Sequence, residues 1–191
     1  MTEYADYGYD APYALVIFAI IGAAGTIGAI VAWRAGDRRL TAIMSFYAVF
    51  FLGNALSFFY TTRRGKFVVW NSILDGLHLR GDERVLDMGC GRGAVLLLAA
   101  QHLTTGKAVG VDLWRRLDQS GNSLEATRRN AIAEGVSDRV ELHTANMMAL
   151  PFEDDSFDVI VSNFAIHNIS GRAGRKPSAK RCGCCVRAVG C

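Results

Sequence analysis

The chain has 191 residues, of which 51% are hydrophobic and 20% are charged, with 21 lysines and arginines against 18 aspartates and glutamates. This length suits one domain of ordinary size with an appendage, and the low charge excludes a disordered chain and argues against a nucleic-acid partner. Residues 1–169 carry 15 basic and 18 acidic side chains, whereas residues 170–191 carry six basic ones and no acidic one. The net charge of +3 is therefore a property of the tail.

Two uncharged stretches of 23 residues dominate the first third of the chain. Residues 11–33 read APYALVIFAIIGAAGTIGAIVAW, and residues 40–62 read LTAIMSFYAVFFLGNALSFFYTT. As a helix, each would be roughly 34 Å long, enough to cross a hydrocarbon core of about 30 Å. A cleaved signal peptide is the alternative for the first stretch, but residues 1–10 lack the basic residues that it requires. We therefore expect residues 1–66 to form a membrane hairpin, with the lipid bilayer as a partner.

Basic residues favour one orientation of this hairpin. Three arginines lie in the loop between the stretches, at residues 34–39, and none precedes the first stretch. Four basic residues follow the second stretch: Arg63, Arg64, Lys66 and Arg80. By the positive-inside rule, four against three favours both termini in the cytoplasm, so we expect a two-helix membrane protein with its catalytic part on the cytoplasmic side.

Small residues recur along the first stretch, at Gly22, Gly25, Gly28 and Ala32. They permit a second helix to pack closely. The interpretation that the sequence favours is that glycine and alanine are simply common in membrane helices.

After residue 66 the pattern changes to short apolar strands separated by helical segments. We expect a helix at residues 67–79 that leads out of the membrane. Strands are predicted at residues 84–88, 106–112, 139–143 and 157–162, and helices at residues 94–102 and 122–134. This alternation predicts βαβ units, and hence an α/β fold with a parallel sheet of about four strands.

The turn after the first predicted strand carries the strongest motif, Asp-Met-Gly-Cys-Gly-Arg-Gly at residues 87–93. Glycines at alternate positions let the backbone turn sharply and approach a ligand without Cβ clashes. The next strand ends in Asp112, whose carboxylate can accept hydrogen bonds from the two hydroxyls of a ribose. Open α/β sheets bind their ligands at this edge, where the strands end.

These motifs resemble the class I S-adenosylmethionine-dependent methyltransferases over residues 83–169, in VLDMGCGRG, VGVDL and LPFEDDSFDVIVSNFAIHNI. The resemblance implies a Rossmann-like methyltransferase domain, which we place at residues 67–169, with S-adenosylmethionine as the cofactor. A nicotinamide-binding domain is disfavoured, because its fingerprint is G-x-G-x-x-G. An acidic residue before the turn would also repel a pyrophosphate.

The resemblance also implies which residues bind the cofactor. The first motif would surround the methionine part, Asp112 would bind the ribose hydroxyls and Leu113 would flank the adenine. Asn146 stands where many relatives have an aspartate that accepts a hydrogen bond from the adenine amino group, and its carbonyl oxygen can accept that bond without charge assistance. The predicted cofactor set is Asp87, Gly89, Cys90, Gly91, Gly93, Asp112, Leu113, Asn146, Met147 and Asn163. Trp114 either stacks on the adenine or packs in the core, and residues 118–123 either close over the cofactor or form a polar loop with a helix cap.

Methyl transfer from a sulfonium needs mainly alignment and desolvation from the protein. A general base is required only where the acceptor loses a proton as it attacks. His167, after the fourth predicted strand, is the catalytic candidate for that role, and it could equally orient a loop or contact the substrate. Asn163 could also line the acceptor site. No metal site is expected, and a small-molecule or lipid-like acceptor suits a site held beside a bilayer. The sequence says nothing of the oligomeric state.

The basic, cysteine-rich tail at residues 170–191 does not continue the expected fold. It is interpreted as disordered or as read out of frame. One choice of codons for residues 177–191, read two bases later, encodes EREAMRVLRPGGRL, which resembles the missing helix and the turn into a fifth strand. Two other functions stay open: an inactive cofactor-binding or membrane-adaptor protein, and a two-helix membrane protein whose remaining part never folds.

Overall fold

The structure is a computed structural model that describes residues 4–115, 118–147, 149–163 and 184–185. The chain divides into two compact units: Tyr9–Lys66 forms one, and Met1–Gly8 with Phe67–Cys191 forms the other. The hairpin unit therefore begins at residue 9, whereas the predicted hairpin region began at residue 1; residues 1–8 belong with the α/β unit. Asp6 and Tyr7 account for the difference, since they hydrogen-bond to Asn130 and Glu134 of that unit.

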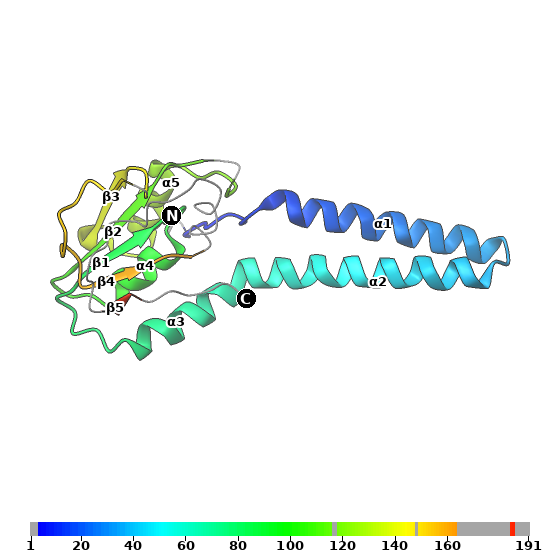
Figure 1. Ribbon diagram of the computed structural model, residues 1–191, viewed down its shortest axis with the longest axis horizontal. Helices are drawn as coiled ribbons and strands as arrows, with labels where there is room; N and C mark the ends of the chain where they lie inside the picture. Colours follow the sequence, from blue (N-terminus) through cyan, green and yellow to red (C-terminus); the bar gives the residue numbers. More distant parts are fainter. Residues whose placement is uncertain (1–3, 116–117, 148, 164–183, 186–191) are drawn as a thin grey trace. The chain divides into compact units, whose positions relative to one another are not determined.

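The Tyr9–Lys66 unit is a helical hairpin. Helices α1 (Pro12–Arg34) and α2 (Arg38–Tyr60) run side by side in opposite directions (Figure 1). The short turn between them ends at Asp37, whose Oδ1 accepts a hydrogen bond from Leu40 N at 3.0 Å and so caps α2. Helix α2 continues through a π-helical turn (Thr61–Gly65) into α3 (Lys66–Gly76), so the basic residues after the second stretch do not end the helix.

Glycines of α1 form the seam of the hairpin. A Cβ at Gly25 would lie 3.0 Å from Ala48 N, and one at Gly22 would lie 2.7 Å from Leu52 Cδ2. Gly22, Gly25 and Ala32 are the buried residues of α1. The expectation that these small residues reflect composition alone was therefore wrong for Gly22 and Gly25, because they lie where α2 approaches the backbone of α1.

The α/β unit contains a parallel sheet in the order β3-β2-β1-β4-β5. Its strands are β1 (Arg84–Met88), β2 (Lys107–Asp112), β3 (Val140–Thr144), β4 (Val159–Val161) and β5 (Cys184–Cys185). Strand β1 is central, with Asp87 opposite Gly110 on one side and opposite Val161 on the other. The predicted α/β fold with a Rossmann-like parallel sheet is confirmed.

The tail contributes one element that sequence reasoning did not anticipate. Residues 184 and 185 form the two-residue strand β5, which pairs in parallel with Val159 and Ile160 of β4. The expectation that nothing after residue 169 joins the sheet was therefore wrong for these two residues. Such pairing needs only the free backbone groups of an edge strand, so side-chain periodicity does not reveal it. The other residues of the tail lie outside the described part of the chain.

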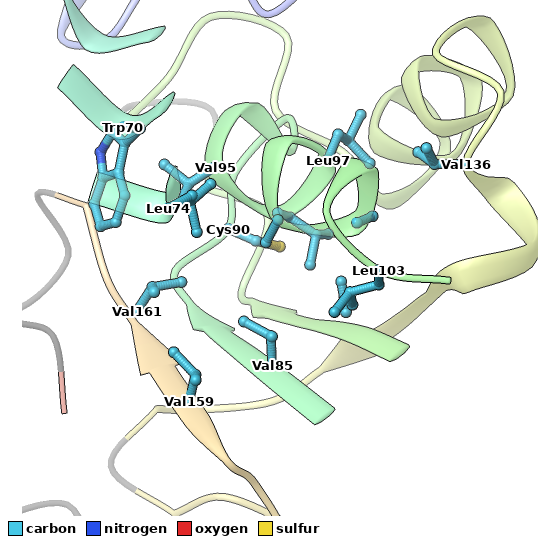
Figure 2. Close-up of a cluster of buried hydrophobic side chains, with 14 of the residues drawn as sticks. Trp70, Leu74, Val85, Cys90, Val95, Leu97, Leu103, Val136, Val159 and Val161 are labelled. Carbon is cyan, nitrogen blue, oxygen red and sulfur yellow. The ribbon is translucent and has the colours of Figure 1, made fainter. Parts of the chain in front are cut away.

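The two faces of the sheet are covered differently. Helices α3, α4 (Ala94–Gln101) and α5 (Leu124–Ala133) contribute to the cluster on one face, where Trp70 and Leu74 pack with Val95 and Val161 (Figure 2). On the other face, Leu86, Met88, Val109, Val111 and Ile160 pack against side chains of the segment 145–157. The central strands are buried on both faces, as their continuous apolar sequences predict.

Candidate cofactor site

The glycine-rich turn lies between the end of β1 and the start of α4. Gly89, Gly91 and Gly93 have φ angles of +77°, +51° and +88°, a region that residues with a Cβ rarely adopt. Gly89 N and Cys90 N donate hydrogen bonds to Val111 O at 2.7 and 3.2 Å, which ties the turn to the end of β2. Glycine is therefore required here because of the backbone conformation. The backbone of the turn lies beside the ends of β1 and β2.

Asp87 is a buried carboxylate with an unused acceptor. Its exposed fraction is 1%, and its Oδ1 has no hydrogen-bond partner among the described residues, while the backbone of Leu96 donates one hydrogen bond to the carboxylate. Burial first, and then the negative charge of Asp112, raise the pKa of Asp87 to about 7. A buried polar atom without a partner is costly in a folded protein. A cationic ligand group would satisfy this oxygen and favour the ionised carboxylate.

Asp112 lies at the end of β2 and organises the surrounding backbone. Its Oδ2 accepts a hydrogen bond from Gly91 N at 2.9 Å, and its Oδ1 accepts one from Trp114 N at 2.6 Å. Asn122 Nδ2 lies 3.3 Å from the same Oδ1. A carboxylate has about four acceptor positions and these bonds occupy three, so Asp112 keeps one position for a ligand hydroxyl. The structure thus brings Asp87, Asp112 and the glycine-rich turn together at one sheet edge.

The loop at residues 118–123 contacts the glycine-rich turn. Gln119 is 8% exposed, and its Oε1 accepts a hydrogen bond from Arg92 N at 2.7 Å. A side chain at Gly91 would overlap this same oxygen. Ser123 caps α5 by accepting a hydrogen bond from Ala126 N at 3.1 Å. The predicted helix cap is therefore confirmed at Ser123, whereas closure of the loop over the cofactor stays a prediction.

Sequence reasoning missed a second layer of residues behind the turn. Thr127 Oγ1 donates a hydrogen bond to Gly91 O at 2.7 Å, and Asn130 Nδ2 donates one to Arg92 O at 2.9 Å. Both side chains are buried on α5. A threonine and an asparagine one turn apart on the apolar side of a helix were the available signal, because buried polar side chains need partners.

Cys90 contributes its backbone to the turn but not its side chain. The sulfur points into the apolar cluster beneath α4 (Figure 2), and a Cβ at Gly110 would lie 2.8 Å from Cys90 Sγ. Burial raises the pKa of the Cys90 thiol well above its ordinary value, and the negative charges of Asp87 and Asp112 raise it further. The thiol is therefore part of the hydrophobic core. Only the backbone of residue 90 remains a candidate for the predicted contact with the cofactor.

The residues predicted around the adenine lie at the ends of β2 and β3. Leu113 is 43% exposed, and Asn146 is also exposed. Met147 packs on the second face of the sheet. Trp114 adopts a positive φ of +57°, and its Nε1 donates a hydrogen bond to Thr144 Oγ1 at 2.7 Å. This bond holds the indole across the ends of β2 and β3.

Asn163 follows β4 and is half-buried. Its neighbour Ser162 donates a hydrogen bond from Oγ to Met88 O at 2.9 Å, which holds the end of β4 beside the end of β1. His167 lies outside the described residues, so its predicted catalytic role stays a prediction.

Comparisons with known proteins agree with this geometry. Residues 85–182 match the family model described as a methyltransferase domain. A demethylmenaquinone methyltransferase of Symbiobacterium thermophilum is 37% identical over 94 residues, which cover 49% of this chain and 35% of that protein. A ribosomal protein L11 methyltransferase of an Enterobacter species is 38% identical over 96 residues, which cover 50% and 27%. The chain thus spans about a third of the length of these curated relatives.

Solved structures are similar over about half of the chain. A geranyl diphosphate methyltransferase in complex with S-adenosylmethionine has 26% identity and a TM-score of 0.46, over 55% of this chain and 40% of that one. A methyltransferase of Thiobacillus denitrificans in complex with S-adenosylhomocysteine has 26% identity and a TM-score of 0.41, over 51% and 36%.

The chain belongs to the methyltransferase domain family, because the family model covers about half of it, including every strand from β1 to β4. It is related to the class I S-adenosylmethionine-dependent methyltransferases, as the motifs predicted. The residues present fit that cofactor: Asp87 offers an unpartnered buried oxygen, Asp112 offers acceptors, and the glycine-rich turn keeps side chains away.

Proposed function

We propose that this protein is a membrane-anchored methyltransferase that uses S-adenosylmethionine to methylate an acceptor dissolved in the bilayer. The observation that carries the enzymatic part is the unpartnered Oδ1 of Asp87 beside Asp112 and the glycine-rich turn. Family membership supports the same reaction.

S-adenosylmethionine supplies a methyl group already activated by its sulfonium charge, so the protein's task is binding and alignment. Asp87 would accept a hydrogen bond from the ammonium group of the methionine part, and Asp112 would accept one from a ribose hydroxyl at its remaining acceptor position. The carbonyl oxygen of Asn146 would accept a hydrogen bond from the adenine amino group. His167 would take the proton of an acceptor that loses one.

Membrane anchoring rests on the surface of the hairpin. Among the described residues, 19 of the 24 exposed large hydrophobic side chains belong to α1 and α2. In each candidate span, only 11% of the apolar 18-residue segment is buried. A core helix of a water-soluble protein would be mostly covered. Two polar side chains within the helices are bonded to their own helix: Thr26 Oγ1 donates to Gly22 O at 2.9 Å, and Asn54 Nδ2 donates to Phe50 O at 2.7 Å. Both features suit a hydrocarbon environment.

The first residues support a topology in which both ends of the hairpin lie on one side of the bilayer. Asp6 and Tyr7 precede α1, yet they bond to Asn130 and Glu134, which follow α2. If both helices span the bilayer, the chain leaves the α/β unit and returns to it on the same side. The positive-inside rule favours the cytoplasm for that side, where the cofactor is available.

The acceptor class is inferred from this location. A domain held at the bilayer surface meets membrane-dissolved substrates at high local concentration. Two of the curated relatives are named demethylmenaquinone methyltransferases, whereas others are named for ribosomal proteins. The membrane hairpin favours an acceptor dissolved in the bilayer over a ribosomal protein.

The test uses the full chain in lipid nanodiscs with S-adenosylmethionine labelled in its methyl group. Nanodiscs carrying a membrane lipid extract and a soluble cell extract are offered as separate sources of acceptor. We expect label in the lipid fraction, and a loss of transfer of at least about tenfold in Asp112→Ala. Label only in soluble protein contradicts the acceptor class. Cofactor binding without any transfer would instead favour the inactive cofactor-binding or membrane-adaptor protein.

A further inference from the structure

Residues 6–8, termed here the N-terminal strap, pack on the α/β unit. Asp6 N donates a hydrogen bond to Asn130 Oδ1 at 2.9 Å, and Asn130 Nδ2 donates one back to Asp6 O at 2.8 Å. Tyr7 O accepts a hydrogen bond from Gln119 Nε2 at 3.1 Å, and the Tyr7 hydroxyl donates one to Glu134 Oε1 at 2.9 Å. Backbone and side chain both anchor the strap.

The side chains that hold the strap also hold the glycine-rich turn. Gln119 accepts the hydrogen bond from Arg92 N on its Oε1 while it donates to Tyr7 O from its Nε2. Asn130 Nδ2 reaches both Arg92 O and Asp6 O. Each amide therefore bridges the strap and residue 92.

Arg92 itself is clamped from the same side. Its Nη2 forms an ion pair with Asp6 Oδ2 at 3.0 Å, and its Nη1 donates a hydrogen bond to Ser120 O at 3.1 Å. The side chain of Arg92 is only 11% exposed, and its Nε has no hydrogen-bond partner among the described residues. Without the strap, this buried guanidinium would lose its carboxylate, and Gln119 and Asn130 would lose one partner each.

We propose that the N-terminal strap is a positioning element of the cofactor site. It fixes Arg92 and Gln119, these fix the backbone at residue 91, and Gly91 N donates to Asp112 Oδ2 at 2.9 Å. This inference rests on the proposed function. Three residues separate the strap from the first residue of α1. The segment that leads into the first apolar helix thus also shapes the turn that binds the cofactor.

Two glycines allow a matched test. Gly8 has a φ of +62°, and an added Cβ would lie 2.6 Å from Ser120 O and 2.9 Å from Ser120 Oγ. Gly135 has a φ of +69° with no atom within 4 Å of an added Cβ. Gly8→Ala and Gly135→Ala therefore impose a similar backbone strain on the same unit, but only Gly8→Ala pushes the strap away from the loop. Asp6→Ala is a second strap variant. It removes the ion pair with Arg92, and the substituted side chain is exposed.

The experiment measures S-adenosylmethionine binding by calorimetry on the full chain in nanodiscs, and hydrogen–deuterium exchange of residues 89–93 without ligand. We expect the Kd to rise about tenfold in Gly8→Ala, severalfold in Asp6→Ala and less than about twofold in Gly135→Ala. Exchange at the turn should accelerate in both strap variants and stay unchanged in Gly135→Ala. A purely structural strap would lower the unfolding temperature without a selective change at the turn.

Equal Kd values and equal exchange in folded Gly8→Ala and Gly135→Ala would overturn the proposal. If Gly8→Ala does not fold, the comparison of Asp6→Ala with Gly135→Ala decides instead. A wild-type chain that does not bind S-adenosylmethionine would count against the proposed function instead. In that case the exchange at residues 89–93 still decides whether the strap fixes the turn.

Discussion

Asp87 combines a charge with a position that water does not reach. Its unpartnered oxygen is useful only with a cationic ligand group beside it. We expect Asp87→Asn to weaken S-adenosylmethionine binding about 10- to 100-fold, the size of a lost hydrogen bond to a charged group. Calorimetry on the full chain measures this.

Asp154→Asn is the control for Asp87→Asn, because residue 154 is an exposed aspartate in the loop before β4. It removes the same charge from the chain without touching the site. A similar affinity loss in both variants would mean that Asp87 acts only through the net charge of the domain.

The raised pKa of Asp87 also predicts how the stability of the ligand-free protein depends on pH. The pKa is about 7 in the folded protein and 3.8 for an ordinary aspartate. Between these values the folded state holds a proton that the unfolded chain has released. The free energy of unfolding should therefore fall as the pH rises from about 4 to about 7.

Unfolding of wild type and Asp87→Asn, followed from pH 4 to pH 8, tests this dependence. The variant should gain stability relative to wild type as the pH rises, and the difference should level off above about pH 7. A difference that does not change with pH would contradict the raised pKa.

At the residue scale, the sequence identifies the atoms near the ligand better than those that support them. Asp87, Asp112 and the three glycines of the turn form a recognisable pattern, because each occupies a strand end or a turn that demands its residue type. Gln119 and Asn130 carry no such local signal, since their role depends on a loop, a helix and the first residues of the chain meeting in space. Only the fold brings them together.

At the scale of elements, the α1–α2 seam depends on the absence of side chains. A Cβ at Gly25 would lie 3.0 Å from Ala48 N, a backbone atom that cannot rotate away. Gly25→Leu should therefore separate the two helices and lower the unfolding temperature of the hairpin by several degrees, as overpacking of about 1–3 kcal/mol does. Circular dichroism of the full chain in detergent measures the change.

Gly53→Leu is the matched variant for this experiment, because no atom lies within 4 Å of an added Cβ at residue 53 of α2. Its effect should be small, or slightly stabilising through better helix propensity. If both leucine variants unfold at the wild-type temperature, close glycine packing does not hold the hairpin together.

The elements themselves follow the sequence closely where apolar periodicity is strong. Strand β1 has the predicted bounds, β2 begins one residue later than predicted, and α1 and β3 are each shifted by one residue at both ends. Two features depend on more than local pattern: the continuous helix through Thr61–Gly65, where basic residues looked like a boundary, and β5, which pairs through backbone alone. The shifted reading frame of residues 177–191 stays a prediction, which sequencing of the gene tests.

At the scale of the whole molecule, the N-terminal strap and the hairpin together constrain the topology. The strap bonds to α5, and both candidate spans lie between them in the chain. A single crossing would put the strap and α5 on opposite sides of the bilayer and break every contact of Asp6 and Tyr7. Two crossings keep these contacts, with the turn at residue 36 on the far side.

Cysteine labelling in sealed membrane vesicles tests this topology. The background is a chain in which Cys182, Cys184, Cys185 and Cys191 are serine, since Cys90 is buried and should not react. Tyr4, Gly36 and Asp154 are exposed positions, and each is replaced by cysteine in turn. With right-side-out vesicles and a reagent that does not cross membranes, we expect Gly36→Cys to react from the outside, and Tyr4→Cys and Asp154→Cys to react only after the vesicles are opened. Reaction of Tyr4→Cys and Gly36→Cys from one side, or of Tyr4→Cys and Asp154→Cys from opposite sides, would contradict two crossings and, with them, the proposed anchoring of the enzyme.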